Sequence, residues 1–94
     1  MTITRYFQRS LSLFTTARPL GLEIDKETYD CRISLFGNRP DFAYISEHEE
    51  DIRGDKVSFK MTTYATQTPA VVQFIEVTGE EEAVQEEAEY ICHI

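Results

Sequence analysis

The chain has 94 residues, which suits one domain and is too short for two ordinary ones. Its 17 acidic and 9 basic side chains give a net charge of −8, which argues against direct nucleic-acid binding because phosphate contacts need clustered cations. No apolar run approaches the roughly 18 residues of a membrane span, so we expect no membrane insertion. Residues 1–94 are therefore expected to form a single compact domain.

The two cysteines indicate neither a metal motif nor a disulfide framework. Cys31 and Cys92 lie far apart in the sequence, and a single distant pair matches no such pattern. A bridge between them stays an open alternative if the C-terminus packs beside residue 31. No apolar segment follows a basic start, so the sequence shows no secretory signal and we predict a cytoplasmic protein.

Residues 3–16 carry two competing patterns. Apolar side chains recur at the spacing of one helix face, at Ile3, Phe7, Leu11 and Phe14. Threonine and aromatic side chains near the N-terminus favour a strand instead. We favour a helix and keep an extra strand as the alternative. Arg18-Pro19 ends the element, because the residue before a proline avoids the helical region.

Residues 20–36 are predicted to form a β-hairpin with one buried face. Apolar and polar side chains alternate over 20–24 and again over 29–36, which is the period of a half-buried strand. The polar residues 25–28 supply the turn. A cluster with glycine, asparagine and proline at 37–41 ends the second strand.

The middle of the chain predicts two more strands. Phe42–Ser46 is a short apolar segment, and the acidic residues 47–51 after it are expected to lie in a loop. This loop has its tip at 52–55, where Gly54 supplies the positive φ that a tight connection requires. Residues 57–65 alternate most cleanly and form the longest predicted strand.

A final strand and a helix complete the predicted fold. After a turn at 66–69, residues 70–77 are apolar on both faces, which is typical of a central strand covered on each side. Thr78 and Glu81 fit a capping box at the start of an amphipathic helix over 79–91. The fold class is α+β: an antiparallel β-meander of about five strands, with this C-terminal helix and the N-terminal helix or strand packed on it.

The sequence offers little catalytic chemistry. His48 lies in the acidic run without metal-loop spacing, so we expect a solvated loop and no metal. His93 follows Cys92 at the end of the chain, where neighbouring residues rarely reach catalytic geometry. The glycines are isolated and no serine has a nucleophile-elbow context, so we predict no cofactor and no catalytic residue.

Two groups of residues are candidates for binding. Phe36 and Tyr64 point away from the cleaner apolar faces of their predicted strands, and exposed aromatic side chains are enriched at interfaces and in ligand cavities. Glu82, Glu86 and Glu89 lie on the polar face of the C-terminal helix, where an acidic surface can steer association with a cationic protein.

We therefore hypothesise a non-catalytic, acidic protein-interaction module. The apolar strand 70–77 and the abundance of aromatic residues favour a homodimer, and the acidic face suits a basic protein as a further partner. An inhibitor or nucleic-acid mimic is a narrower form of this hypothesis. The alternative is a small-ligand-binding α+β protein with an aromatic-lined pocket, or a small enzyme that uses that pocket.

Overall fold

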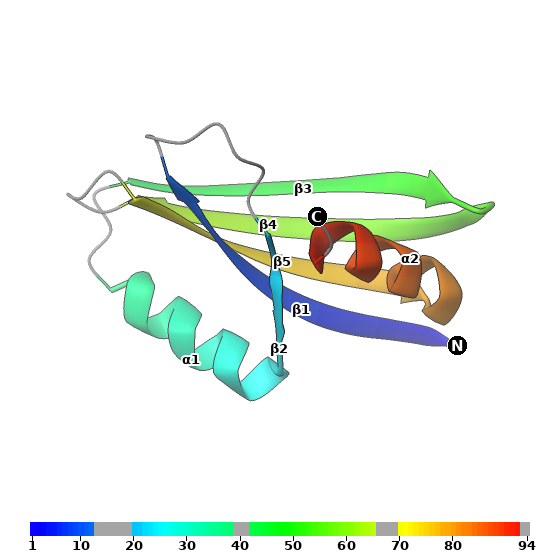
Figure 1. Cartoon of the computed structure of the whole chain (residues 1–94), viewed down its shortest axis with the longest axis horizontal. Helices are drawn as coiled ribbons and strands as arrows, with labels where there is room; N and C mark the ends of the chain where they lie inside the picture. Colours follow the sequence, from blue (N-terminus) through cyan, green and yellow to red (C-terminus); the bar gives the residue numbers. More distant parts are fainter. Residues whose placement is uncertain (13–19, 39–41, 66–69, 93–94) are drawn as a thin grey trace.

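The computed structural model describes residues 1–12, 20–38, 42–65 and 70–92 and has the predicted α+β class (Figure 1). The elements are β1 (Thr2–Ser12), β2 (Leu22–Ile24), α1 (Lys26–Phe36), β3 (Phe42–Ile52), β4 (Asp55–Ala65), β5 (Ala70–Glu80) and α2 (Glu81–Cys92). The strands form one sheet in the order β2-β1-β5-β4-β3, and every neighbouring pair is antiparallel. The turn predicted at 66–69 and His93 lie outside the described residues.

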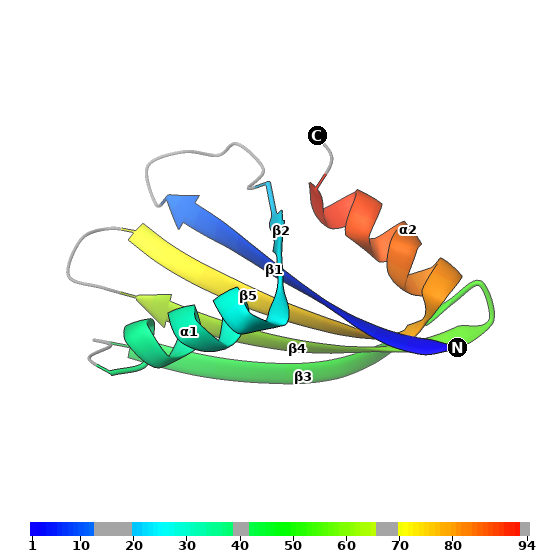
Figure 2. The ribbon, with the colours of Figure 1, turned by 90° about the horizontal axis from the view of Figure 1, so that it is seen from below.

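The meander is continuous from β3 to β5, and the N-terminal part of the chain joins it from the other side. β1 pairs with β5 over eleven residues, from Thr2↔Glu80 to Ser12↔Ala70. β2 adds the outer edge beside β1. The chain then crosses through α1 from this edge to β3 at the opposite edge (Figures 1 and 2). β5 is therefore the central strand, as predicted from its two apolar faces.

The helix favoured for 3–16 is wrong over the described part of that segment, and the strand alternative is correct. Residues four apart share a face in a helix and also in a strand, so the spacing of Ile3 and Phe7 did not distinguish the two. Phe7 packs on one face of the sheet, while its neighbour Tyr6 packs on the other. Both faces are covered, so β1 lacks the polar alternation of a half-exposed strand. Phe14 lies outside the described residues.

The predicted strand at 29–36 is also wrong, because α1 occupies it. Asp25 is the N-cap, and its carboxylate accepts a hydrogen bond of 2.6 Å from the backbone N–H of Thr28. Tyr29, Ile33 and Phe36 then recur at helical spacing and face the sheet. The predicted alternation had also placed two exposed side chains inside, Cys31 and Leu35. Of the predicted hairpin, the first strand alone is present, as β2.

The acidic residues 47–51 continue β3 and do not form a loop. β3 and β4 pair from Phe42↔Ala65 to Ile52↔Asp55, around a turn in which Arg53 and Gly54 have φ values of 57° and 84°. This is the tight connection expected at 52–55. Lysines compensate the acids across the ladder, because Lys60 lies opposite Glu47 and Lys56 lies opposite Asp51.

Two cores lie on opposite faces of the sheet and at opposite ends of the strands. The first lies under α2 and consists of Phe7, Val57, Phe59, Ile75, Val77, Ala83, Val84, Ala88 and Ile91. The second lies under α1 and centres on Tyr29, Tyr64 and Phe74. Along β4 the buried face changes sides between Phe59 and Thr62, because each helix covers a different half of the strand (Figure 2).

The capping box predicted at Thr78 is not formed. β5 continues to Glu80, so Thr78 lies inside the sheet, where its hydroxyl is hydrogen-bonded to the hydroxyl of Thr4 at 2.9 Å. The apolar face predicted for the helix is buried, with Val84 fully inaccessible. The alternative of a Cys31–Cys92 bridge is wrong, because both thiols are free and lie on different helices.

Candidate functional site

The exposed side of α2 carries a continuous acidic surface, called here the acidic helix face: Glu81, Glu82, Glu86 and Glu89. All four side chains are exposed, and α2 contains no basic residue. With Arg53 and Gln85 they line a shallow hollow on the surface. The structure therefore places the three predicted residues Glu82, Glu86 and Glu89 together, at the surface and on one element.

Packing on the opposite side of α2 fixes the orientation of this face. Ala83 and Val84 are fully buried and Ala88 is 4% exposed, so the helix cannot turn about its axis without exposing the core. The carboxylates make few contacts. Arg53 Nε lies 3.2 Å from Glu86 Oε2, and the Gln85 amide donates a hydrogen bond of 3.3 Å to Glu89. An exposed ion pair of this kind contributes about 0–1 kcal/mol, so it is easily exchanged for a contact with a partner.

Phe36 and Tyr64 are brought together, but inside the protein. Their rings lie 5.8 Å and 6.0 Å from the ring of Phe74, and Tyr64 is only 8% exposed. The expectation that Tyr64 points to solvent is wrong, because α1 covers that face of the sheet. Phe36 is half-buried for the same reason, since it belongs to α1 and not to a strand. A binding role for this pair stays a prediction.

A groove that the sequence analysis missed runs between α2 and the sheet. Its volume is about 300 Å³, and its lining residues are Arg9, His48, Glu50, Phe59, Met61, Ile75, Glu87, Tyr90 and Ile91. The His48 ring stacks on Phe59 at 4.9 Å, and its Nε2 atom lies 3.3 Å from Glu50 Oε1. If residues 47–51 are treated as a strand, His48 and Glu50 fall on one face. Because residues 47–51 were predicted to form a loop, this shared face was not recognised from the sequence.

Glu87 is the perturbed carboxylate of this groove. Burial raises its pKa, and the neighbouring charges of Glu50 and Glu86 raise it further, whereas His48 lowers it. Among the residues that the structure describes, no group of three histidine, cysteine or acidic side chains is placed to hold a metal ion. The groove is open, and so differs from the closed aromatic pocket that the ligand-binding alternative requires.

Glu87→Gln is expected to raise the melting temperature at pH 7 and to leave it nearly unchanged below pH 4. A raised pKa means that the native state holds the proton more tightly than the unfolded chain does. The stability cost of Glu87 therefore develops as the pH rises above its ordinary pKa of 4.5 and is complete above the raised value. Thermal melts from pH 3 to 8 measure this effect. The exposed Glu89→Gln is the control, and equal melting curves for Glu87→Gln and the wild type at pH 7 contradict the assignment.

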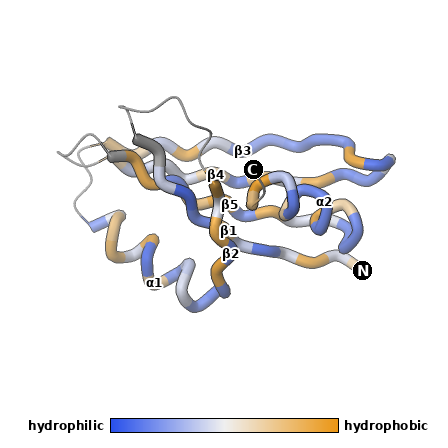
Figure 3. The backbone as a smooth tube through the Cα atoms, in the orientation of Figure 1, coloured by the Kyte–Doolittle hydropathy of each residue, from blue (hydrophilic) through white to orange (hydrophobic). Residues whose placement is uncertain are grey.

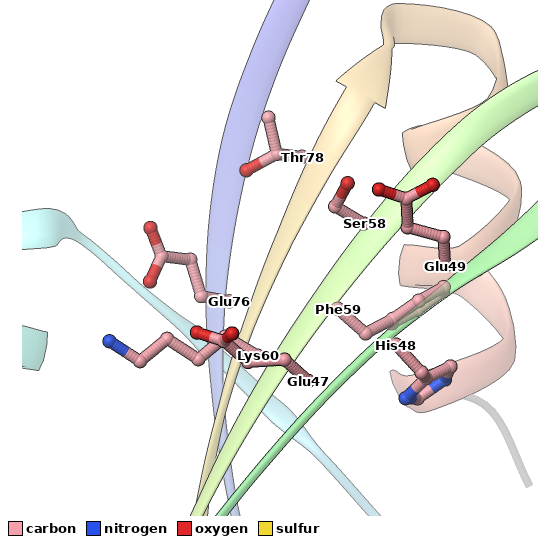
Figure 4. Close-up of a pocket in the computed structure, with 8 residues that line it drawn as sticks. All are labelled: Glu47, His48, Glu49, Ser58, Phe59, Lys60, Glu76 and Thr78. Carbon is pink, nitrogen blue, oxygen red and sulfur yellow. The ribbon is translucent and has the colours of Figure 1, made fainter.

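A second hollow lies on the sheet face opposite α2, beyond the part that α1 covers (Figure 4). Here Lys60 lies between Glu47 and Glu76 in the register, and the next row contains Glu49, Ser58 and Thr78. His48 and Phe59 extend to the other side of the sheet, where they stack. Lys60 is the one lysine beside three acids in this hollow, so it compensates their charge only in part.

Comparison with known proteins supplies no relative from which a function can be transferred. No family model, no curated protein and no solved structure matches the chain. Among the described residues, no helix combines the length and hydrophobicity needed to cross a bilayer.

Proposed function

We propose that this protein is a non-catalytic, homodimeric interaction module whose acidic helix face docks a basic protein. The observation that carries the proposal is the row formed by Glu82, Glu86 and Glu89 on the exposed side of a helix whose other side is buried. An inhibitor, or a mimic of the nucleic acid that such a basic protein binds, is the narrower form of this function.

The spacing of the row suits guanidinium and ammonium groups. Glu82 and Glu89 are seven residues apart, which is about 10 Å along a helix, and Glu86 lies between them. Carboxylates at this separation can each accept hydrogen bonds from a different arginine or lysine, and arginine–carboxylate pairs are among the stronger polar contacts. Because packing already holds the helix in place, little backbone conformational entropy is lost when a partner binds.

The charge of the whole chain acts in the same direction. A net charge of −8 attracts a cationic partner over a distance of about 10 Å at 0.1 M ionic strength, and this attraction weakens as salt rises. At α1, by contrast, Lys26 neutralises Asp30 at 2.8 Å. α2 has five acids and no base, whereas α1 has two of each, so the acidic surface is stronger at α2.

The test is calorimetric titration with a defined cationic peptide, octa-arginine, at low and physiological salt. The double variant Glu82→Lys with Glu89→Lys is expected to weaken binding by about tenfold or more, because it removes two attractive charges and adds two repulsive ones at the docking surface. The control is Glu27→Lys with Asp30→Lys on α1, which changes the net charge equally. This control is expected to weaken binding by less than about threefold.

Equal losses of affinity in the two double variants would show that octa-arginine senses net charge alone, and would contradict the proposal. Circular dichroism checks that both variants are folded. This check matters because Glu82 lies in the first turn of α2, where replacing an acid by a lysine costs about 0.3–1 kcal/mol through the helix dipole.

A further inference from the structure

β3 is a long edge strand of the sheet, and no described strand pairs with its outer side. It has eleven residues and, among the described strands, pairs with β4 alone, whereas the opposite edge strand β2 has three residues. Its first half is apolar and exposed: Phe42, Tyr44 and Ile45 are 56%, 58% and 59% accessible. Native sheets protect such edges with charges, prolines or bulges, or use them for pairing. Residues 42–46 contain no charge and no proline, and their register with β4 has no bulge.

The β3–β4 turn determines which backbone groups of β3 are free. Ile52 and Asp55 flank a two-residue turn, and the pair flanking such a turn exchanges both of its hydrogen bonds. Alternate residues counted back from Ile52, including Tyr44, then direct their N–H and C=O groups toward β4. Ala43, Ile45 and Glu49 direct theirs away from β4, to the open side of the sheet.

The charge pattern of β3 favours pairing of a second copy through the first half of the strand. The second half contains Glu47, Glu49, Glu50 and Asp51, so antiparallel pairing of two second halves would place carboxylates opposite carboxylates. Pairing centred on Tyr44 involves Phe42–Ser46 alone, and it is the longest overlap within β3 in which every paired residue is uncharged. It places Tyr44 opposite its own copy, Ala43 opposite Ile45 of the second copy, and no acid opposite another acid. Figure 3 shows the same division, with hydrophobic residues at the start of β3 and hydrophilic ones over most of the rest.

We propose that two copies of this chain pair antiparallel along β3, with the twofold axis at Tyr44. The inference rests on the homodimer of the proposed function and names its surface and register. Side chains meet on both faces of the joined sheet: Phe42 and Tyr44 on the face that α2 partly covers, Ala43 and Ile45 on the other. The first half of β3 lies at the end of the strands away from α2 (Figure 1). Antiparallel pairing there would put the two α2 helices at opposite ends of the joined sheet, so the dimer would be bivalent.

A basic partner is not the occupant of this edge. The described residues 42–46 carry no charge for it to recognise, and the acids that would attract it lie farther along the strand. A neutral segment with free backbone groups matches a second copy of itself, because pairing centred farther along β3 brings its acidic residues into the overlap.

Proline substitutions at the outward positions test the register. Ile45→Pro removes an outward N–H inside the overlap, and Glu49→Pro removes one outside it, while both keep the hydrogen bonds to β4. Light scattering on a sizing column measures the mass at about 10–100 μM, because dimers depend on concentration. The wild type and Glu49→Pro are expected at twice the 10.9 kDa chain mass, and Ile45→Pro at 10.9 kDa.

A monomeric wild type, a dimeric Ile45→Pro or a folded but monomeric Glu49→Pro each overturns the proposal. If a proline variant does not fold, Ile45→Lys replaces Ile45→Pro and Glu49→Lys replaces Glu49→Pro, with the same expected masses. Titration with octa-arginine distinguishes failure of the dimer proposal from failure of the docking proposal. A monomeric Ile45→Pro is expected to bind octa-arginine with the same affinity per chain as the wild type. Failure of the docking proposal would instead show as equal losses of affinity in the α1 and α2 double variants.

Discussion

Phe74→Ala is expected to lower the free energy of unfolding by about 3–5 kcal/mol. Phe74 is fully inaccessible, and its ring makes edge contacts with Tyr29 and Tyr64 at 6.0 Å and a tilted contact with Phe36 at 5.8 Å. The substitution therefore leaves a cavity between α1 and the sheet that three large side chains cannot fill without moving. Since domains of this size have a stability of about 5–15 kcal/mol, the variant loses a large fraction of it.

Urea denaturation followed by circular dichroism measures this loss. Leu35→Ala is the matched control, because Leu35 is a large apolar residue of α1 that is 72% exposed, and its truncation is expected to change stability by less than about 0.5 kcal/mol. A loss below about 1 kcal/mol for Phe74→Ala would mean that α1 does not pack on the sheet as described.

Val84→Asp is expected to cost at least about 3–5 kcal/mol, enough to separate α2 from the sheet or to unfold the chain. Val84 is fully buried in the core under α2, together with Val57, Val77 and Ile91. A carboxylate at this position would be buried without a partner, and the nearby surface of α2 is already acidic.

The same residue type at an exposed position of α2 provides the control. Glu82→Asp keeps the charge at the surface and is expected to change stability by less than about 0.5 kcal/mol. Thermal and urea unfolding of the two variants give the comparison. A Val84→Asp protein that unfolds like the wild type would contradict the packing of α2, and with it the fixed orientation of the acidic helix face.

The sequence correctly predicted those elements whose hydrophobic pattern fits only one type of secondary structure. β4 alternates cleanly, β5 is apolar on both faces, and α2 has an apolar row at Val84, Ala88 and Ile91 that fits a helix alone. β1 and α1 were assigned wrongly because their patterns fit two structures. Ile3 and Phe7 share a face in a helix and in a strand, and the period-two pattern of 29–36 coexists with a helical one. The N-cap formed by Asp25 was the local signal that decides in favour of α1.

The candidate site, too, could be predicted only where a single element determines it. The acidic helix face could be predicted because one helix carries it and helical periodicity specifies which side is exposed. The groove could not be predicted, because His48 of β3 and Glu87 of α2 meet only when the whole sheet is assembled. The burial of Tyr64 likewise depends on α1 crossing the sheet, which no pattern near residue 64 encodes.

The most direct measurement of the central claim is where a cationic ligand binds. Amide chemical shifts of the wild-type chain, recorded by NMR during titration with octa-arginine, give this position residue by residue. The acidic helix face predicts the largest changes at Glu82, Gln85, Glu86 and Glu89, with little change along α1. Changes spread evenly over all acidic residues, or centred on β3 or α1, would contradict the claim that α2 is the docking surface.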